Sequence, residues 1–249
     1  MNYRKDYIRI GTKRRSGQKI NAVKFIVAHD TGNDKSTAKN NVDYYKRTAD
    51  QMSASAHLFV DDKECVECIP LNEKAWHVLY DRTEDNRMFG YNANDAAIGV
   101  ELCYFSNDKQ RSLKAYKNYV KVIADLCREY KLNPVNKVVG HSRLDSGRKT
   151  DPENALKRIG KTFESFIQDI VDELEPKPTN KERCTVSVKF ANTSNKLKEY
   201  QSLLKDLELN AVIKKGVAQT VIDVWFAAES SRYGEVVFWL DKNNIKYHI

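Results

Sequence analysis

A nearly continuous apolar run indicates the fold class: Ala97-Ile98-Gly99-Val100-Glu101-Leu102-Cys103-Tyr104. Such a run is typical of a strand in the centre of a sheet, where side chains on both faces are covered. Sheets of this kind are usually covered by helices, as in α/β proteins. The carboxylate of Glu101 is the one charged group in the run, so it is a candidate functional side chain.

A second short apolar run, residues 22–28, lies upstream and is followed directly by His29. The turn-prone residues 30–34 come next, so the pattern predicts a strand with His29 at its end. Between the two runs, the spacing of apolar residues predicts a helix over about residues 36–51. A hairpin is predicted from residues 56–60 and 64–69.

Downstream, apolar residues recur at helical spacing from Leu113 to Tyr130, and Asn133-Pro134 is predicted to stop that helix. The strand-like residues 137–140 then lead to His141. A last helix of this part is predicted to carry the apolar residues from Ile159 to Leu174.

Two prolines and very few apolar residues mark a linker after this part of the chain. We predict a catalytic domain over residues 1–175, a linker over 176–183 and a small domain over 184–249. In the small domain the pattern alternates strand, helix, strand, strand, helix, strand. This βαββαβ order predicts a ferredoxin-like α+β domain.

The composition describes an ordinary globular chain of 249 residues with a net charge of +8. The excess of basic residues favours an anionic partner, but no basic tail is set apart for nucleic acid. The odd number of cysteines, five, indicates reduced thiols. The first residues lack an apolar signal region, and no segment has the ~20 apolar residues of a membrane helix. We therefore expect no membrane insertion, and accumulation in the cytoplasm until release.

Three separated side chains suggest a catalytic zinc centre: His29, His141 and Asp151. A catalytic zinc takes three protein ligands and leaves its fourth position to water. Glu101 suits the base that accepts the proton of that water, because burial raises the pKa of a carboxylate. Lys149 lies two positions before Asp151, on the same side of an extended segment, where it would stabilise an oxyanion.

Six motifs occur in the order seen in the zinc-dependent N-acetylmuramoyl-L-alanine amidases of the amidase type 2 family, and the chain resembles that family over roughly residues 20 to 172. The motifs are His29-Asp30-Thr31, Ser55-Ala56-His57-Leu58-Phe59-Val60, Ala75-Trp76-His77, Ile98-Gly99-Val100-Glu101, Gly140-His141-Ser142-Arg143 and Arg148-Lys149-Thr150-Asp151-Pro152. The resemblance implies a central, mostly mixed β-sheet flanked by helices, with the zinc cleft on one face.

The resemblance also implies that His29, His141 and Asp151 bind one zinc ion, that Glu101 activates water and that Lys149 steadies the oxyanion. Some relatives place Cys at the third ligand position and Tyr just before the His of the second motif; position 56 here is Ala and receives no catalytic role. We expect Trp76 and His77 to line the substrate cleft.

Other residues have side chains that could bind a metal or a sugar, but the sequence gives less support for such roles. We interpret His57 as supporting a ligand or as structural, because a fourth protein ligand would remove the water position. Cys65 and Cys68 have no second pair with which to form a zinc site, so they are interpreted as core residues. Most aromatic residues of the small domain are expected in its core, and any exposed ones would stack on sugars.

The favoured hypothesis is a phage or prophage endolysin that cleaves the amide between N-acetylmuramic acid and L-alanine. Its partners would be bacterial peptidoglycan and possibly anionic wall polymers, and the small domain, which loosely resembles wall-targeting domains of Bacillus and Clostridium phage lysins, would bind the wall. Self-association is possible but not indicated. Two alternatives stay open: a non-catalytic peptidoglycan receptor, and a zinc peptidase that acts within the stem peptide.

Overall fold

The chain divides into two compact units, Met1–Glu175 and Pro176–Ile249. The computed structural model describes residues 3–174, 183–207, 209, 211–227 and 231–248. The predicted linker, residues 176–183, therefore lies outside the described residues except for Arg183. Within the described ranges, none of the helices combines the length and apolar character that a membrane span requires.

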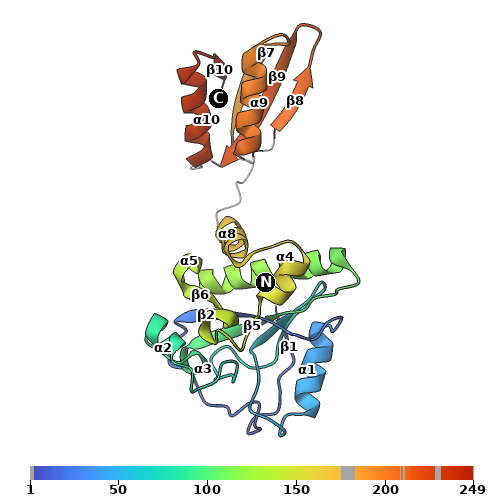
Figure 1. Ribbon diagram of the computed structural model, residues 1–249, viewed down its shortest axis with the longest axis vertical. Coiled ribbons are helices and arrows are strands. Elements are labelled where there is room, and N and C mark those ends of the chain that lie inside the picture. Colours follow the sequence, from blue (N-terminus) through green and yellow to red (C-terminus); the bar gives the residue numbers. More distant parts are fainter. Residues whose placement is uncertain (1–2, 175–182, 208, 210, 228–230, 249) are drawn as a thin grey trace. The chain divides into compact units, whose positions relative to one another are not determined.

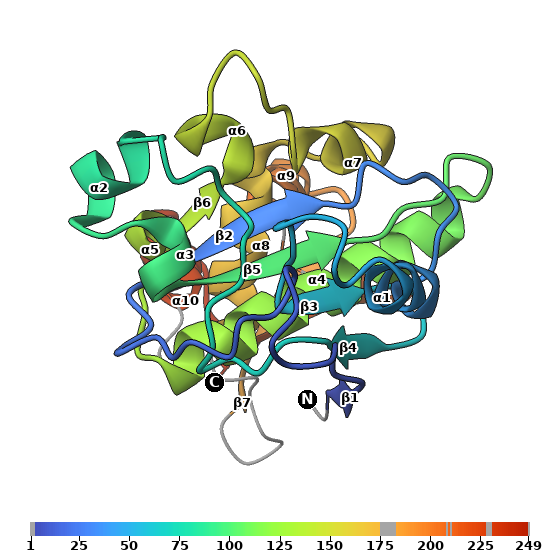
Figure 2. The same ribbon diagram turned by 90° about the horizontal axis from the view of Figure 1, so that it is seen from below.

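A six-stranded mixed sheet forms the centre of the larger unit, with the strand order β1-β4-β3-β5-β2-β6 (Figure 2). Only β3 and β4 pair antiparallel; every other neighbouring pair is parallel. The strands are β1 (Arg4–Lys5), β2 (Phe25–Asp30), β3 (Leu58–Val60), β4 (Cys65–Glu67), β5 (Ala97–Leu102) and β6 (Val138–Gly140). The predicted central strand, hairpin and mixed sheet are thus confirmed.

Eight helices surround this sheet in the described part of the larger unit: α1 (Ala38–Arg47), α2 (Glu84–Phe89), α3 (Ala93–Ala96), α4 (Lys109–Glu129), α5 (Pro134–Lys137), α6 (His141–Leu144), α7 (Glu153–Arg158) and α8 (Phe163–Leu174). The long helix α4 begins where the Asp108 side chain accepts a hydrogen bond from the Arg111 backbone N–H. Helices α4 and α8 lie together on one side of the sheet (Figure 1).

Two predictions for this unit were wrong in detail. The apolar residues from Ile159 to Leu174 do not share one helix, because α7 ends before Ile159 and Gly160 adopts a left-handed φ of 77°. Helix α4 ends at Glu129 with Tyr130 as its C-cap, before Asn133-Pro134 is reached, so Pro134 does not stop it. With Asn133 capping the backbone N–H of Val135, Pro134 starts the short helix α5, where proline fits the first helical position.

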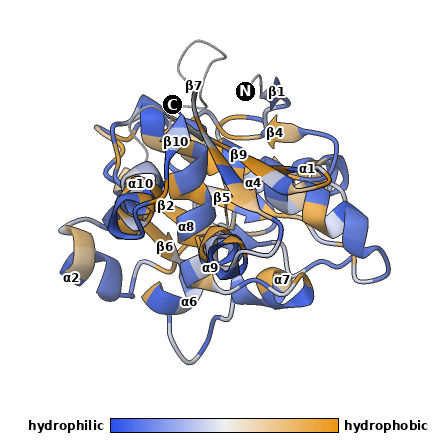
Figure 3. Ribbon diagram, turned by 90° about the horizontal axis from the view of Figure 1, so that it is seen from above, coloured by the Kyte–Doolittle hydropathy of each residue, from blue (hydrophilic) through white to orange (hydrophobic). Residues whose placement is uncertain are grey.

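Alternation along the strands gives the sheet two different faces. Ile26, Ala28 and Val100 belong to the apolar core that contains the buried side of α4. Successive residues of a strand point to opposite faces, so His29 and Glu101 project from the other face. In Figure 3 the strands of both units are mostly orange, and many of the loops are blue. The sheet therefore offers its second face, near the strand ends, to polar side chains.

The smaller unit contains a four-stranded antiparallel sheet with the order β10-β7-β9-β8. Its described elements follow in the order β7 (Arg183–Ala191), α9 (Asn195–Asp206), β8 (Ala211–Lys215), β9 (Gln219–Ala227), α10 (Ser231–Lys242) and β10 (Tyr247–His248). Buried residues of both helices and the strands β7 and β9 form one apolar core, which includes Val188, Tyr200, Ile222 and Leu240. The unit thus has a core of its own.

Candidate metal centre and active site

Parallel strands bring the first two candidate residues together. His29 and Glu101 are direct partners in the register of β2 and β5, so their side chains leave the same face of the sheet side by side. Strand β6 pairs with the other edge of β2 and also runs parallel to it. The carboxyl ends of all three strands therefore meet at one edge, which is where ligands bind in sheets of this kind.

The third and fourth candidates come from the segment after β6. His141 follows Gly140 directly and is the first residue of the short helix α6. The backbone N–H of Ser142 donates to the carbonyl of Asp151 at 2.9 Å, so the loop between them is closed at its base. A Cβ at Gly140 would lie 3.0 Å from Cδ of Pro152, so a larger residue would crowd this closure.

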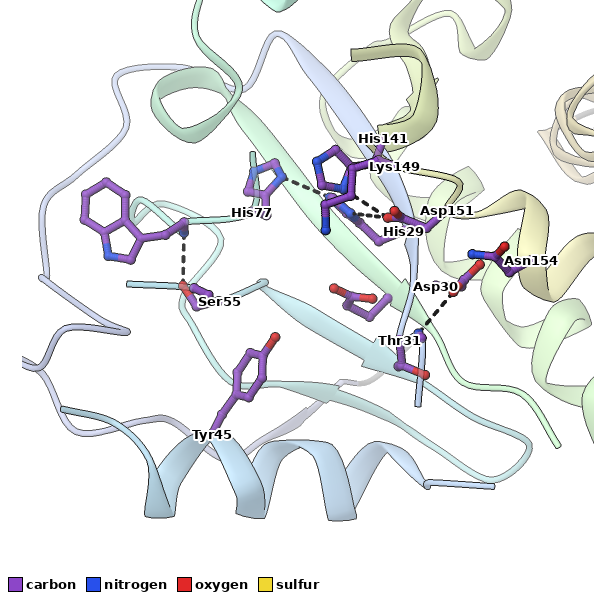
Figure 4. A pocket seen from close by; sticks show the side chains of 14 residues that line it. His29, Asp30, Thr31, Tyr45, Ser55, His77, His141, Lys149, Asp151 and Asn154 are labelled. Carbon is purple, nitrogen blue, oxygen red and sulfur yellow. Dashed lines mark hydrogen bonds and ion pairs between the residues drawn. The ribbon is translucent and has the colours of Figure 1, made fainter. Parts of the chain in front are cut away.

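The structure brings His29, His141 and Asp151 into one cluster, with one ligand atom of each within 4.8 Å of the others (Figure 4). Oδ2 of Asp151 lies 2.9 Å from Nδ1 of His29 and 3.1 Å from Nδ1 of His141. Ligands on a tetrahedral zinc with bonds of 2.0–2.1 Å are separated by about 3.3 Å. Two imidazoles and a carboxylate at these separations fit a zinc ion.

The electrostatics of the cluster agree with such a role. Burial acts to raise the pKa of Asp151, but the hydrogen bonds with His141 and His29 outweigh burial and hold that pKa well below its usual range. Burial lowers the pKa of His29 to about 4, with Asp151 acting in the opposite direction. At neutral pH the site therefore presents a neutral imidazole and an ionised carboxylate, which are the protonation states that bind metal.

Glu101 lacks a partner in the same pocket. Its Oε2 atom is buried and has no hydrogen-bond partner in the described part of the chain. Burial raises the pKa of Glu101 well above its usual value, and the nearby carboxylates Asp151 and Asp30 add to that rise, while Lys149 opposes it. A carboxylate with a raised pKa holds a proton more strongly, as a general base near neutral pH requires.

One pocket of about 270 Å³ collects all seven residues that the sequence predicted for the metal centre, the catalytic pair and the substrate cleft: His29, His141, Asp151, Glu101, Lys149, Trp76 and His77. Lys149 reaches it from the loop between α6 and α7, and Figure 4 places its side chain beside the cluster. His77 is buried, and its Nδ1 lies 3.1 Å from Nε2 of His29.

His57 is buried and is not among the residues that line the pocket. Its Nε2 lies 2.9 Å from the carbonyl of Glu73, and its Nδ1 accepts the backbone N–H of Gly99 at 3.0 Å. Both ring nitrogens are therefore occupied by backbone groups, and burial lowers the pKa of His57 to about 4. These contacts favour the structural interpretation of His57.

Several lining residues had received no role from the sequence: Asp30, Thr31, Tyr45, Ser55 and Asn154. The hydroxyl of Tyr45 points into the pocket from helix α1 (Figure 4). Its ring lies under the guanidinium of Arg14, 4.1 Å from the ring centroid, and edge-on to Phe59. Tyr45 also lines an adjoining cavity of about 380 Å³. Tyr45 lies among the apolar residues of the helix predicted over about residues 36–51, and no local signal separated it from a core residue.

The backbone near Asp30 is fixed by that side chain, which accepts hydrogen bonds from the N–H groups of Gly32 and Ala155, each at 3.1 Å. Ser55 Oγ likewise accepts the Trp76 N–H at 3.0 Å. These contacts hold the segments that form the walls of the pocket.

Comparison with known proteins identifies related chains. The family model described as "N-acetylmuramoyl-L-alanine amidase" (Amidase_2) matches residues 19–154. A protein named "Probable N-acetylmuramoyl-L-alanine amidase" from Bacillus licheniformis is 32% identical over 216 residues, which are 84% of this chain and 56% of that protein. The amidase CwlL of Bacillus licheniformis is 36% identical over 144 residues, 55% of this chain and 38% of CwlL.

The fold of the larger unit is also similar to that of solved structures. The catalytic domain of PlyG has a TM-score of 0.55 and 29% identity, with 72% of this chain and all of that domain covered. The catalytic domain of XlyA has a TM-score of 0.54 and 29% identity, with 68% of this chain and 99% of that domain covered. The chain spans only about two fifths to a little over half of the two curated relatives described above.

Proposed function

The chain belongs to the N-acetylmuramoyl-L-alanine amidase family, and from that premise we propose that it is a peptidoglycan hydrolase of the endolysin type. It would cleave the amide between the lactyl group of N-acetylmuramic acid and the L-alanine of the stem peptide. The observation that carries this proposal is the convergence of His29, His141 and Asp151 beside the unpartnered carboxylate of Glu101.

In this proposal His29, His141 and Asp151 would hold one zinc ion, which would act as a Lewis acid and lower the pKa of water to about 7. Glu101 accepts the proton of the water that adds to the amide carbon. Lys149 presents its ammonium group to the oxyanion that forms. Glu101 then passes the proton to the amide nitrogen as the C–N bond breaks, which releases a lactyl carboxylate and the free amino group of alanine.

Mass spectrometry of peptidoglycan digested by the purified chain tests the bond that is cut. The expected fragments are stem peptides with a free amino-terminal alanine and glycan strands whose lactyl groups are carboxylates. A new amino terminus elsewhere in the stem peptide would favour the zinc peptidase instead. Tight binding to walls without any released peptide would favour the non-catalytic receptor.

We further propose that the smaller unit binds the bacterial wall. Residues 183–249 contain ten basic and seven acidic side chains, which favours anionic wall polymers. The unit has its own apolar core and also exposes apolar side chains, among them Val217 and Phe238. An isolated exposed side chain is ordinary, but an exposed aromatic ring is a surface on which sugars stack.

Deleting residues 183–249 tests that role. The truncated chain is expected to hydrolyse soluble muropeptides at the rate of the full chain, because every residue of the pocket lies in the larger unit. Its binding to sedimented cell walls should weaken, and so should lysis of intact cells. The measurement compares the two chains in a wall-sedimentation assay and a soluble-substrate assay. Equal wall binding by both chains would contradict the proposed role.

A further inference from the structure

His77 occupies a position that differs from that of a simple cleft residue. Its side chain is buried, with 8% relative exposure, and its Nδ1 lies 3.1 Å from Nε2 of His29. The other ring nitrogen of His29, Nδ1, faces Asp151 at 2.9 Å. The ring of His29 is therefore held at both ends, with the candidate metal ligands on one side and His77 on the other.

The tautomer of His29 follows from these contacts. An imidazole that binds a metal through Nδ1 must carry its proton on Nε2. That N–H then needs an acceptor, and Nδ1 of a neutral His77 is placed to accept it. A ligand histidine whose second nitrogen is hydrogen-bonded keeps both its ring orientation and its tautomer.

The surrounding structure fixes His77 in this position. The backbone N–H groups of His77 and Val78 both donate to Oδ1 of Asn94, at 2.9 and 3.1 Å, and Asn94 donates back to the carbonyl of Val78. The ring lies over Gly99, where an added Cβ would come within 2.7 Å of Cγ of His77. Only glycine at position 99 leaves room for the imidazole.

Burying the polar ring of His77 costs folding free energy. With Nδ1 accepting from His29, Nε2 of His77 carries a hydrogen; that atom is buried and makes no hydrogen bond of good geometry in the described ranges, where the backbone of Ala97 is the polar group that interacts with the ring. A buried polar atom without a partner destabilises the fold, and an apolar side chain would avoid this cost. The contact with His29 is the interaction that an apolar side chain could not make.

Building on the proposed function, we infer that His77 is a positioning residue of the metal centre: it accepts the Nε2–H of His29 and so holds Nδ1 of His29 toward the ion. This differs from the cleft-lining role predicted from the sequence, which involves the substrate. The two roles have different consequences. A positioning residue sets the affinity for zinc with no substrate present, whereas a cleft residue affects substrate binding and leaves zinc affinity alone.

Zinc affinity of the full chain, measured by competition with a chromogenic chelator in the absence of substrate, tests the inference. His77→Leu is expected to weaken zinc binding by about 10- to 100-fold, the range for lost hydrogen bonds to metal ligands. His77→Asn keeps an acceptor oxygen on the same carbon as Nδ1, so it should recover most of that affinity. Trp76→Ala, in the same pocket wall, should bind zinc as the parent does.

Gly99→Ala provides a second route that leaves His77 itself intact. Its Cβ would displace the imidazole, so zinc affinity should again fall, and thermal unfolding followed by circular dichroism checks that each variant is folded. Parental affinity in the folded His77→Leu variant would overturn the inference, and so would equal losses in His77→Leu and His77→Asn. If His77→Leu does not fold, the His77→Asn and Gly99→Ala affinities decide. A parent chain that binds no zinc would instead refute the proposed function itself.

Discussion

Glu101→Gln is expected to lower the rate of amide hydrolysis by about 10²- to 10⁴-fold, the usual contribution of a general base. The substitution keeps the size of the side chain but removes its ability to accept the proton of the attacking water. Burial already raises the pKa of Glu101, so the native carboxylate is a stronger base than an exposed glutamate. Zinc content should not change, because Glu101 is not one of the three clustered ligands.

The measurement is the initial rate on soluble muropeptide together with the zinc content of each purified variant. Glu64→Gln provides a matched control, since Glu64 pairs with Arg4 outside the pocket and should behave as the parent does. A Glu101→Gln variant with parental rate would remove Glu101 from the mechanism. Loss of zinc together with activity would show that Glu101 acts on the metal centre instead.

His141→Ala is expected to abolish both zinc binding and hydrolysis. Removing one of three protein ligands leaves an imidazole and a carboxylate, which are too few to hold the ion in a catalytic site. The side chain of His141 is buried, and its Nδ1 lies 3.1 Å from Oδ2 of Asp151. Metal analysis after dialysis, combined with the rate on soluble muropeptide, measures both effects.

Chelation provides the matching test on the unmodified chain. A chelator should remove activity from the parent, and added zinc should restore it, whereas zinc should restore nothing in His141→Ala. His248→Ala, in strand β10 of the smaller unit, is the control histidine and should keep both properties. Full activity of the parent after complete metal removal would contradict the zinc mechanism.

The sequence was most informative where local pattern and burial coincide. Strands β2 and β5 could be predicted from their apolar runs, because a strand that is covered on both faces needs apolar side chains at nearly every position. The ligand candidates followed from the placement of histidine and aspartate after such strands and from a familiar order of motifs. The structure brings those residues together as that interpretation required.

The contacts that support the cluster of His29, His141 and Asp151 could not be predicted from the sequence. Nothing near residue 77 in the sequence indicates that its ring meets His29, because 48 residues separate the two and the contact depends on the register of β2 with β5. Tyr45 was hidden for a similar reason, since its helical spacing matches that of a core residue. The apolar spacing had predicted one helix from Ile159 to Leu174, but the left-handed conformation of Gly160 separates α7 from α8.

X-ray absorption at the zinc edge of the purified full chain shows directly which side chains bind the ion. We expect one zinc per chain, with two imidazole nitrogens and oxygen ligands at about 2.0–2.2 Å. The described part of the chain also contains four buried free cysteines, at positions 65, 68, 103 and 127, and zinc held by a cysteine would show sulfur scattering. Sulfur scattering at about 2.3 Å, or a spectrum without imidazole, would contradict the centre formed by His29, His141 and Asp151.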